Sequence, residues 1–230
     1  MRTVANSRKP VEIAAEEMFA TIVQTLLREY RQAEASAAIA LELSEKHQYS
    51  TFAGISRVHL GHARAESGRV IEGILLMRRG IDDLLRIGRH PGLSRWILFL
   101  ATAQQRTGQL VDALETVEQA LRLNPEVLIA RPEGLRVCGE IRFKEGEIDR
   151  AEADFRESIA LARTMGAKAL ELRSTMSLAR LLDQRGRRDE ARAMLAEIYD
   201  WFIEGFDIAD LKEAKTLLEQ FVAQSVKCRS

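Results

Sequence analysis

Two histidines, His59 and His62, lie three residues apart in a segment that we expect to be helical. That spacing places two imidazoles on one face of a helix, where they could bind a metal ion. Glu66 follows one turn later, but no other nearby carboxylate or cysteine completes a ligand set. We therefore expect no metal site and no cofactor, and we expect both histidines to be solvated or partly packed.

The two cysteines, Cys138 and Cys228, are too far apart for a CxxC metal site and form no disulfide framework. Cys138 adjoins Gly139 on an apolar helical face, so we expect a small buried thiol rather than a nucleophile. Cys228 lies in a polar tail and is expected to be exposed. The chain also contains no G-x-S-x-G and no H-E-x-x-H segment. We expect no catalytic residue and no enzyme activity.

The charges balance: 34 Lys and Arg face 34 Asp and Glu in 230 residues. A neutral chain is a poor candidate for coating nucleic acid, which needs many uncompensated cations. The longest apolar run, 96–101, is far shorter than the roughly 18 residues of a membrane-spanning helix. Adjacent acids at 16–17 and 82–83 point about 100° apart on a helix and are expected to be solvated. We expect a soluble, cytoplasmic protein with no direct contact to nucleic acid or membrane.

Helices must position these side chains, because apolar residues recur at spacings of three and four along most of the chain. Ala, Leu, Glu and Arg dominate, and all four favour helices. Only four prolines occur, and no segment alternates with the two-residue period of a strand. The sequence predicts an all-α fold.

The helical segments repeat around four glycines that are 40, 38 and 40 residues apart: Gly68, Gly108, Gly146 and Gly186. A small residue lies seven positions before each glycine, another small residue five positions after it, and a bulky residue nine positions after it. In chain order the first set is Gly61, Ala101, Gly139 and Ala179, the second is Gly73, Ala113, Ala151 and Ala191, and the third is Met77, Val117, Phe155 and Leu195.

Each repeated position has a structural role in the helix pair. The glycine closes the first helix of a pair in a left-handed conformation, which costs glycine little. The small residues allow two antiparallel helices to approach, and the bulky residue fills the space beside them. A single hairpin of this kind cannot bury its apolar face, so the hairpins must stack as a solenoid.

This order of small, glycine, small and bulky residues resembles the tetratricopeptide repeat. The unit around Gly108 is the best match and ends at Pro125, where that family places its closing proline. A degenerate first unit is predicted with Tyr30, Ala35 and Ile39 at the glycine, small and bulky positions. The resemblance implies a right-handed superhelix with five units and a terminal helix. The expected ranges are 1–10 for a flexible N-terminus, 11–224 for the repeat domain with units 11–49, 50–90, 91–125, 126–166 and 167–203 and a cap at 207–224, and 225–230 for a tail.

The last 90 or so residues also resemble the C-terminal repeats of large bacterial regulators, which carry a cyclase-type or winged-helix domain and a P-loop ATPase. The matching stretches are AKALELR with SLARLL, IYDWFIEGFD and DLKEAKTLL, and an E-x-x-R-x-x-G-E pattern at 133–140. No GxxxxGK[ST] loop is present, so the regulators' nucleotide chemistry is not carried over. We expect only the repeat module, either as a protein by itself or as a piece of a larger one.

In such stacks the first helices line the concave face, and the repeat register selects the side chains that lie there. They include a cationic excess that suits carboxylates or phosphates. A mixed, solvated face is the alternative. The candidate binding residues are His62, Arg95, Gln105, Arg106, Arg136, Glu140, Lys144, Arg173, Arg180 and Asp183.

The C-terminal region has an aromatic cluster, Tyr199, Trp201, Phe202 and Phe206, which we expect to close the open end of the stack. Asp207 or Asp210 is expected to cap the last helix at its N-terminus.

The sequence thus predicts a protein- or peptide-binding module, the sensory or scaffolding part of a bacterial regulatory system, whose partner could be acidic or a separate effector chain. A sensor that binds a small anionic ligand in the groove is the alternative. An open groove favours the first hypothesis, and an enclosed cavity of about 300 Å³ or more with convergent polar groups favours the second.

Overall fold

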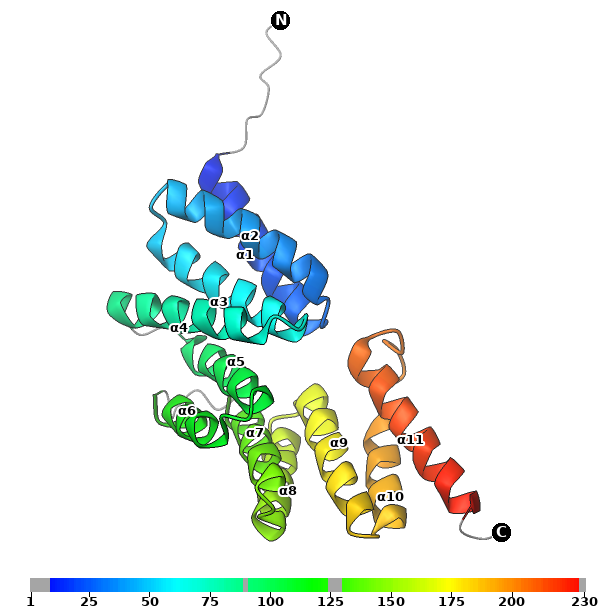
Figure 1. Cartoon of the computed structure of the whole chain (residues 1–230). Coiled ribbons are helices and arrows are strands. Elements are labelled where there is room, and N and C mark those ends of the chain that lie inside the picture. Colours follow the sequence, from blue (N-terminus) through cyan, green and yellow to red (C-terminus); the bar gives the residue numbers. More distant parts are fainter. Residues whose placement is uncertain (1–8, 89–90, 124–129, 228–230) are drawn as a thin grey trace, which may run out of the picture. The chain divides into compact units, whose positions relative to one another are not determined.

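The computed structural model describes residues 9–88, 91–123 and 130–227, and this part of the chain consists of α-helices without a β-strand (Figure 1). Pro125, at the predicted end of the third unit, lies outside the described residues, as does Cys228. The helices are α1 (Pro10–Leu26), α2 (Tyr30–Lys46), α3 (Ser50–Glu66), α4 (Val70–Ile87), α5 (Leu93–Arg106), α6 (Leu110–Leu123), α7 (Ala130–Lys144), α8 (Ile148–Thr164), α9 (Lys168–Gln184), α10 (Arg188–Tyr199) and α11 (Ala209–Lys227).

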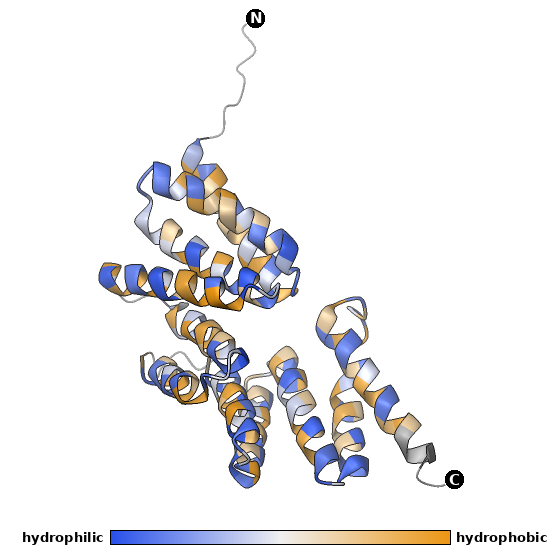
Figure 2. Ribbon diagram, in the orientation of Figure 1, coloured by the Kyte–Doolittle hydropathy of each residue, from blue (hydrophilic) through white to orange (hydrophobic). Residues whose placement is uncertain are grey.

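The chain forms two compact units, residues 1–116 (unit 1) and 117–230 (unit 2), and the division falls inside α6. In unit 1 each helix from α1 to α4 packs against the next one in the chain, and in unit 2 each helix from α7 to α10 does the same. A first helix also packs against the first helix of the following pair. Examples are α1 with α3 in unit 1 and α7 with α9 in unit 2. Each helix carries both hydrophobic and hydrophilic residues (Figure 2). This is the packing expected of stacked, amphipathic helix hairpins.

The turns inside four hairpins have one conformation in common. Gly68, Gly108, Gly146 and Gly186 follow α3, α5, α7 and α9 with φ angles of 97°, 78°, 82° and 76°. A side chain is strained in that left-handed region, and a glycine there ends the helix at little cost. The glycine spacing in the sequence therefore marks the point at which each chain segment reverses.

The first hairpin differs from our expectation by two residues. Its left-handed residue is Arg28, with φ of 61°, and not Tyr30, which begins α2. Ala35 and Ile39, predicted to hold the small and bulky positions, are exposed. Counting from Arg28 instead places Ala33 and Ala37 at those positions, and both are fully buried.

The repeated small and bulky positions lie in the helix interfaces of both units. Met77, Val117, Phe155 and Leu195 have no exposed surface. In unit 1, a Cβ atom added to Gly61 would lie 2.7 Å from the carbonyl oxygen of Gly73. In unit 2, a Cβ atom added to Gly139 would lie 2.5 Å from the ring of Phe155. Helix α4 thus meets α3 backbone to backbone, whereas an aromatic ring fills the corresponding space between α7 and α8.

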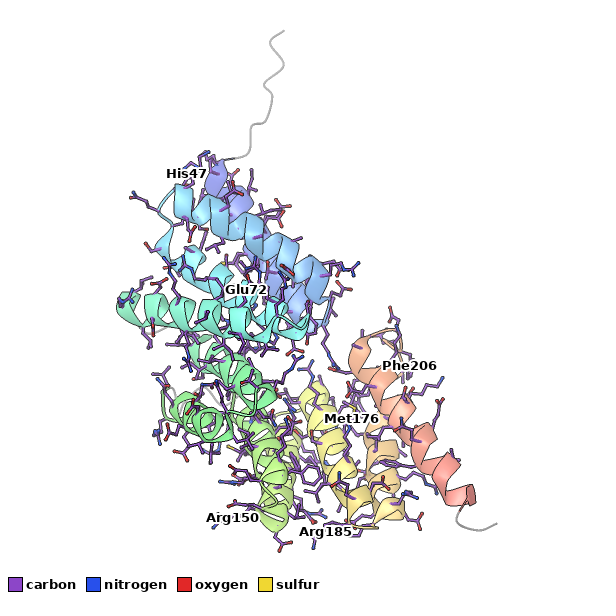
Figure 3. All side chains as sticks on the ribbon, viewed as in Figure 1. His47, Glu72, Arg150, Met176, Arg185 and Phe206 are labelled. Carbon is purple, nitrogen blue, oxygen red and sulfur yellow. The ribbon has the colours of Figure 1, made fainter. Side chains whose placement is uncertain are left out.

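The end of unit 2 is covered by α11. Leu211, Ala214, Leu217 and Phe221 of this helix are buried against α9 and α10 and join the core that holds Leu195. The predicted aromatic cap is wrong in part, because Trp201 and Phe206 are 57% and 46% exposed. Phe206 lies in the segment that connects α10 to α11 (Figure 3). The aliphatic face of α11, more than the aromatic rings, closes this end.

Helix α11 begins at Ala209, so Asp207 precedes the helix and Asp210 lies in its first turn. Neither carboxylate occupies the residue immediately before the helix. Asp210 instead accepts a hydrogen bond from Arg173 of α9. No helix in the described part of the chain is long and apolar enough to cross a membrane.

Candidate functional site

The two histidines singled out by their spacing are packed inside unit 1. The ring of His59 is 3% exposed and lies between Thr25 of α1 and Trp96 of α5. The indole Nε1–H of Trp96 donates to His59 Nε2 at 3.2 Å, and the Thr25 hydroxyl lies 3.2 Å from Nδ1. Since Nε2 accepts a hydrogen bond, the proton of the neutral ring is on Nδ1, which donates to Thr25.

Burial and the nearby Arg95 lower the pKa of His59 to about 3, which keeps the ring neutral. His62 is also buried and stacks on Phe99 with ring centroids 3.9 Å apart. No three His, Cys, Asp or Glu side chains gather into a possible metal site among the described residues. The histidines connect α1, α3 and α5, and they are more deeply buried than we expected from the sequence.

Cys138 is buried, and burial, with the Asp154 carboxylate nearby, raises the pKa of its thiol to about 11. A thiol with a raised pKa is protonated at neutral pH and is a poor nucleophile. This environment agrees with a packing role for Cys138.

The remaining candidates on unit 1 are partly covered. Gln105 is 5% exposed, and the guanidinium of Arg95 lies 5.9 Å from the ring centroid of Phe99. Arg106 forms an ion pair with Glu66 at 2.9 Å, and its side chain is 35% exposed. These residues offer little free positive charge, because one lies over a ring and the other has a carboxylate partner.

In unit 2 the candidate on α7 is held by its own helix. Arg136 donates to Glu133 through Nε at 3.0 Å and also pairs with Glu140. Burial lowers the pKa of Arg136, but the attraction of Glu133 and Glu140 outweighs it and raises the pKa above its usual value. Glu140 also accepts a hydrogen bond from Ser177 of α9 at 2.9 Å. The guanidinium is therefore fixed in place by carboxylates from positions i−3 and i+4.

Two of the candidates on α9 form ion pairs with the terminal helix α11. Arg173 contacts Asp210 at 2.7 Å, and Arg180 contacts Glu213 at the same distance. Asp183 pairs with Arg188, while Lys144 is exposed at the end of α7. We call the side chains of α7, α9 and α11 that these ion pairs and hydrogen bonds join the first-helix face of unit 2. Its members are Glu133, Arg136, Glu140, Arg173, Ser177, Arg180, Asp210 and Glu213.

The first-helix face has both signs of charge in nearly equal number. Three arginines are matched by four carboxylates, of which Asp210 and Glu213 come from α11. The cationic excess that we counted on the first helices is therefore offset by acids that the count left out. The result agrees with the alternative of a mixed face.

A charged cluster in unit 1 escaped the sequence analysis. Arg57 of α3 is 6% exposed and pairs with both Glu45 of α2 and Asp83 of α4. Asp83, expected to be solvated, also pairs with Arg86 at 2.9 Å. The sequence carried one signal for this cluster, an arginine surrounded by apolar residues in a helix. Such an arginine is expected to be buried, and a buried guanidinium needs anionic partners.

Comparison with known proteins finds a family match in two segments of the chain. Residues 98–119 and 172–197 match the family model described as tetratricopeptide repeat. These segments lie in α5–α6 and α9–α10, two of the hairpins with a glycine turn. No curated protein matches the sequence.

Several solved structures resemble the whole fold. A thermophilic TPR protein of Thermus thermophilus gives a TM-score of 0.67 at 20% identity, over 89% of this chain and 98% of that one. A Rap protein complexed with competence and sporulation factor also gives 0.67, at 12% identity, over 96% of this chain and 66% of that one. BtubC of P. vanneervenii gives 0.63 at 16% identity, over 87% and 92%. These likenesses confirm the predicted all-α helical-repeat fold.

Proposed function

We propose that the chain is a non-catalytic protein-binding module and that the first-helix face of unit 2 contacts its protein or peptide partner. The proposal rests on one observation: polar contacts join the three helices into a continuous face. Arg173 and Arg180 of α9 form ion pairs with α11, and Ser177 of α9 donates a hydrogen bond to Glu140 of α7. Charged side chains held by neighbours lose less conformational freedom on binding than free ones. Such a face supplies specificity through matched charges.

The match to tetratricopeptide repeats and the likeness to a Rap protein that was solved with competence and sporulation factor support a binding role. The resemblance of residues in the C-terminal half to bacterial regulators supports a sensory or scaffolding role in a cytoplasmic regulatory system. Because the first-helix face carries both signs of charge, we propose a partner surface that also carries both, instead of an acidic one.

Capture of proteins from cells of the native source by the tagged chain, followed by mass spectrometry, tests this function. The variant Arg180→Glu places a second carboxylate beside Glu213 and reverses one charge of the face, so we expect it to lose the captured partner. Arg150→Glu is the matched control, because Arg150 is 72% exposed on α8, a second helix. Equal capture by both variants would remove the first-helix face as the binding surface.

A further inference from the structure

The ends of α2, α3 and α4 line an open cleft of about 570 Å³ in unit 1. The three ends lie on the same side of the unit in Figure 1, and His47, which Figure 3 labels, stands next to the cleft residue Gln48. This volume falls within the range of small-molecule sites, roughly 300–1,000 Å³. The first-helix face lies in unit 2, so the cleft is a separate feature of the protein.

Three arginines line the cleft, and they differ in how their charge is used. Arg57 is buried and divided between Glu45 and Asp83, and Arg86 pairs with Asp83. Arg79 has no hydrogen-bond or ion-pair partner among the residues that the structure describes. With both carboxylates of the lining already paired, the charge left for a ligand is positive.

The polar groups of α2 and α3 add hydrogen-bonding capacity. Ser50 begins α3 and lines the cleft, which places the positive end of a 17-residue helix there. Gln48 contributes a side-chain amide. Ser44 also lines the cleft, and its buried hydroxyl has no hydrogen-bond partner in the described structure. An unsatisfied buried hydroxyl is costly, so a ligand or water that reaches it is favoured.

We propose that this cleft binds a small molecule through an oxyanionic group, a carboxylate or a phosphate, with Arg79 and Arg86 as its guanidinium ligands. The fork of a guanidinium matches both groups. Arg86 can turn toward a ligand, because its side chain is 73% exposed and, among the described residues, pairs with Asp83 alone. Arg57 acts as a positioning residue, since it holds α2 and α4 on either side of the cleft through Glu45 and Asp83. A cationic ligand is disfavoured because it must compete with two arginines for those acids.

Titration of the full chain with inorganic phosphate and, separately, with glutarate at constant ionic strength tests the proposal. We expect saturable shifts of the Gln48 side-chain amide and Ser50 backbone amide in NMR spectra with at least one of the two. The anion that binds more tightly identifies the oxyanion. If neither anion saturates these signals at millimolar concentration, the proposal is wrong.

Substitution of two neighbouring arginines tests whether anions bind in the cleft or are only attracted by positive charge on the surface. Arg79→Gln should weaken binding about tenfold, as expected for the loss of one charge-assisted contact. Arg78→Gln is the control, because Arg78 is also exposed on α4 but does not line the cleft. Equal weakening by the two variants overturns the site.

A labelled tetraglutamate peptide provides the third arm. If this peptide binds more than tenfold more tightly than glutarate and Arg79→Gln abolishes the difference, the occupant is a peptide and the small-molecule assignment is overturned. Glutarate binding equal to or tighter than peptide binding supports it. The outcome is independent of partner capture through Arg180, so either proposal can fail alone.

Discussion

Helices α3 and α4 of unit 1 meet at glycines on both sides, so that the backbone of one helix touches the backbone of the other. Gly61 faces Gly73, and Gly80 faces Gly54. In unit 2, Gly139 of α7 faces the ring of Phe155, and Ala179 and Ala191 occupy the small positions of α9 and α10. The same repeat position is thus filled by backbone in the α3–α4 hairpin of unit 1 and by side chains in the α7–α8 and α9–α10 hairpins of unit 2. Side chains can shift when a neighbour grows, whereas helix backbones can separate only as whole elements.

The two units also differ in polar interactions. All four histidines of the chain lie in residues 47–90, within unit 1, where His59 connects three helices. Unit 2 contains no histidine. Arginine–carboxylate pairs link the hairpins of both units, as Arg69 with Glu34 in unit 1 and Arg187 with Glu152 in unit 2. Mild acid should therefore destabilise unit 1 through His59, whereas unit 2 has no histidine that could take up a proton.

The largest expected effect concerns the end of unit 2. Removal of residues 205–230 takes away Leu211, Leu217 and Phe221, and burial of each such side chain contributes roughly 1.5–3 kcal/mol. The apolar surface left around Leu195 should cause self-association. Size-exclusion chromatography with light scattering measures this, with removal of 225–230 alone as the control. A shortened chain that stays monomeric and equally stable would show that α11 is not a cover.

The next largest effect is the loss of stability when a side chain is added at the two kinds of glycine contact. Gly61→Leu should destabilise unit 1 by about 3 kcal/mol or more, because the side chain meets the Gly73 carbonyl. Gly139→Leu should destabilise unit 2 by less, about 1–2 kcal/mol, because the Phe155 ring can move. Urea unfolding of both variants checks the order. If Gly139→Leu costs as much as Gly61→Leu, the distinction between backbone and side-chain packing fails.

The repeat register could be predicted because it depends on local rules. A left-handed turn needs glycine, and close helices need small residues, so Gly68 or Ala113 can be recognised without a structure. The first hairpin was misplaced by two residues because Arg28 adopts the left-handed turn without being glycine. No local rule predicts that exception.

The candidate site was harder to predict because its charges depend on residues far apart in the chain. Arg173 and Arg180 appeared as free cations until α11 brought Asp210 and Glu213 beside them. Likewise, the cleft joins Glu45, Arg57 and Asp83 from three helices. Each helix by itself shows only an ordinary mixture of charges. Partners on neighbouring helices decide whether an arginine is available.

A smaller effect is the response of unit 1 to pH. His59 is neutral in both folded and unfolded chains above its unfolded pKa of about 6.5, so it has no effect there. Below that pH the unfolded chain takes up a proton, while the folded ring stays neutral down to about 3. Stability should therefore fall as pH falls from 6.5 toward 3, by up to about 1.4 kcal/mol per pH unit.

Tryptophan fluorescence can assign this response to one unit. Trp96 lies in unit 1 and Trp201 in unit 2, so a Trp201→Phe background reports unit 1 alone. Urea unfolding at pH 7.0 and 5.5 should give a lower free energy at pH 5.5, and His59→Gln should reduce the difference. A difference that persists in His59→Gln would place the titrating group elsewhere.

The last prediction distinguishes two ion pairs of the first-helix face, and one of them has the smallest expected effect. Arg173→Ala removes the ion pair with Asp210, whose side chain is 8% exposed, and should destabilise unit 2 by about 2 kcal/mol, because a buried carboxylate loses the guanidinium beside it. Arg180→Ala removes a pair with side chains 43% and 37% exposed, and should cost less than about 0.5 kcal/mol. Double-mutant cycles with Asp210→Ala and Glu213→Ala measure both couplings, and added salt should weaken only the exposed one. Equal couplings would mean that Arg180 is as fixed as Arg173. The predicted difference between a buried and an exposed ion pair on this face would then be wrong.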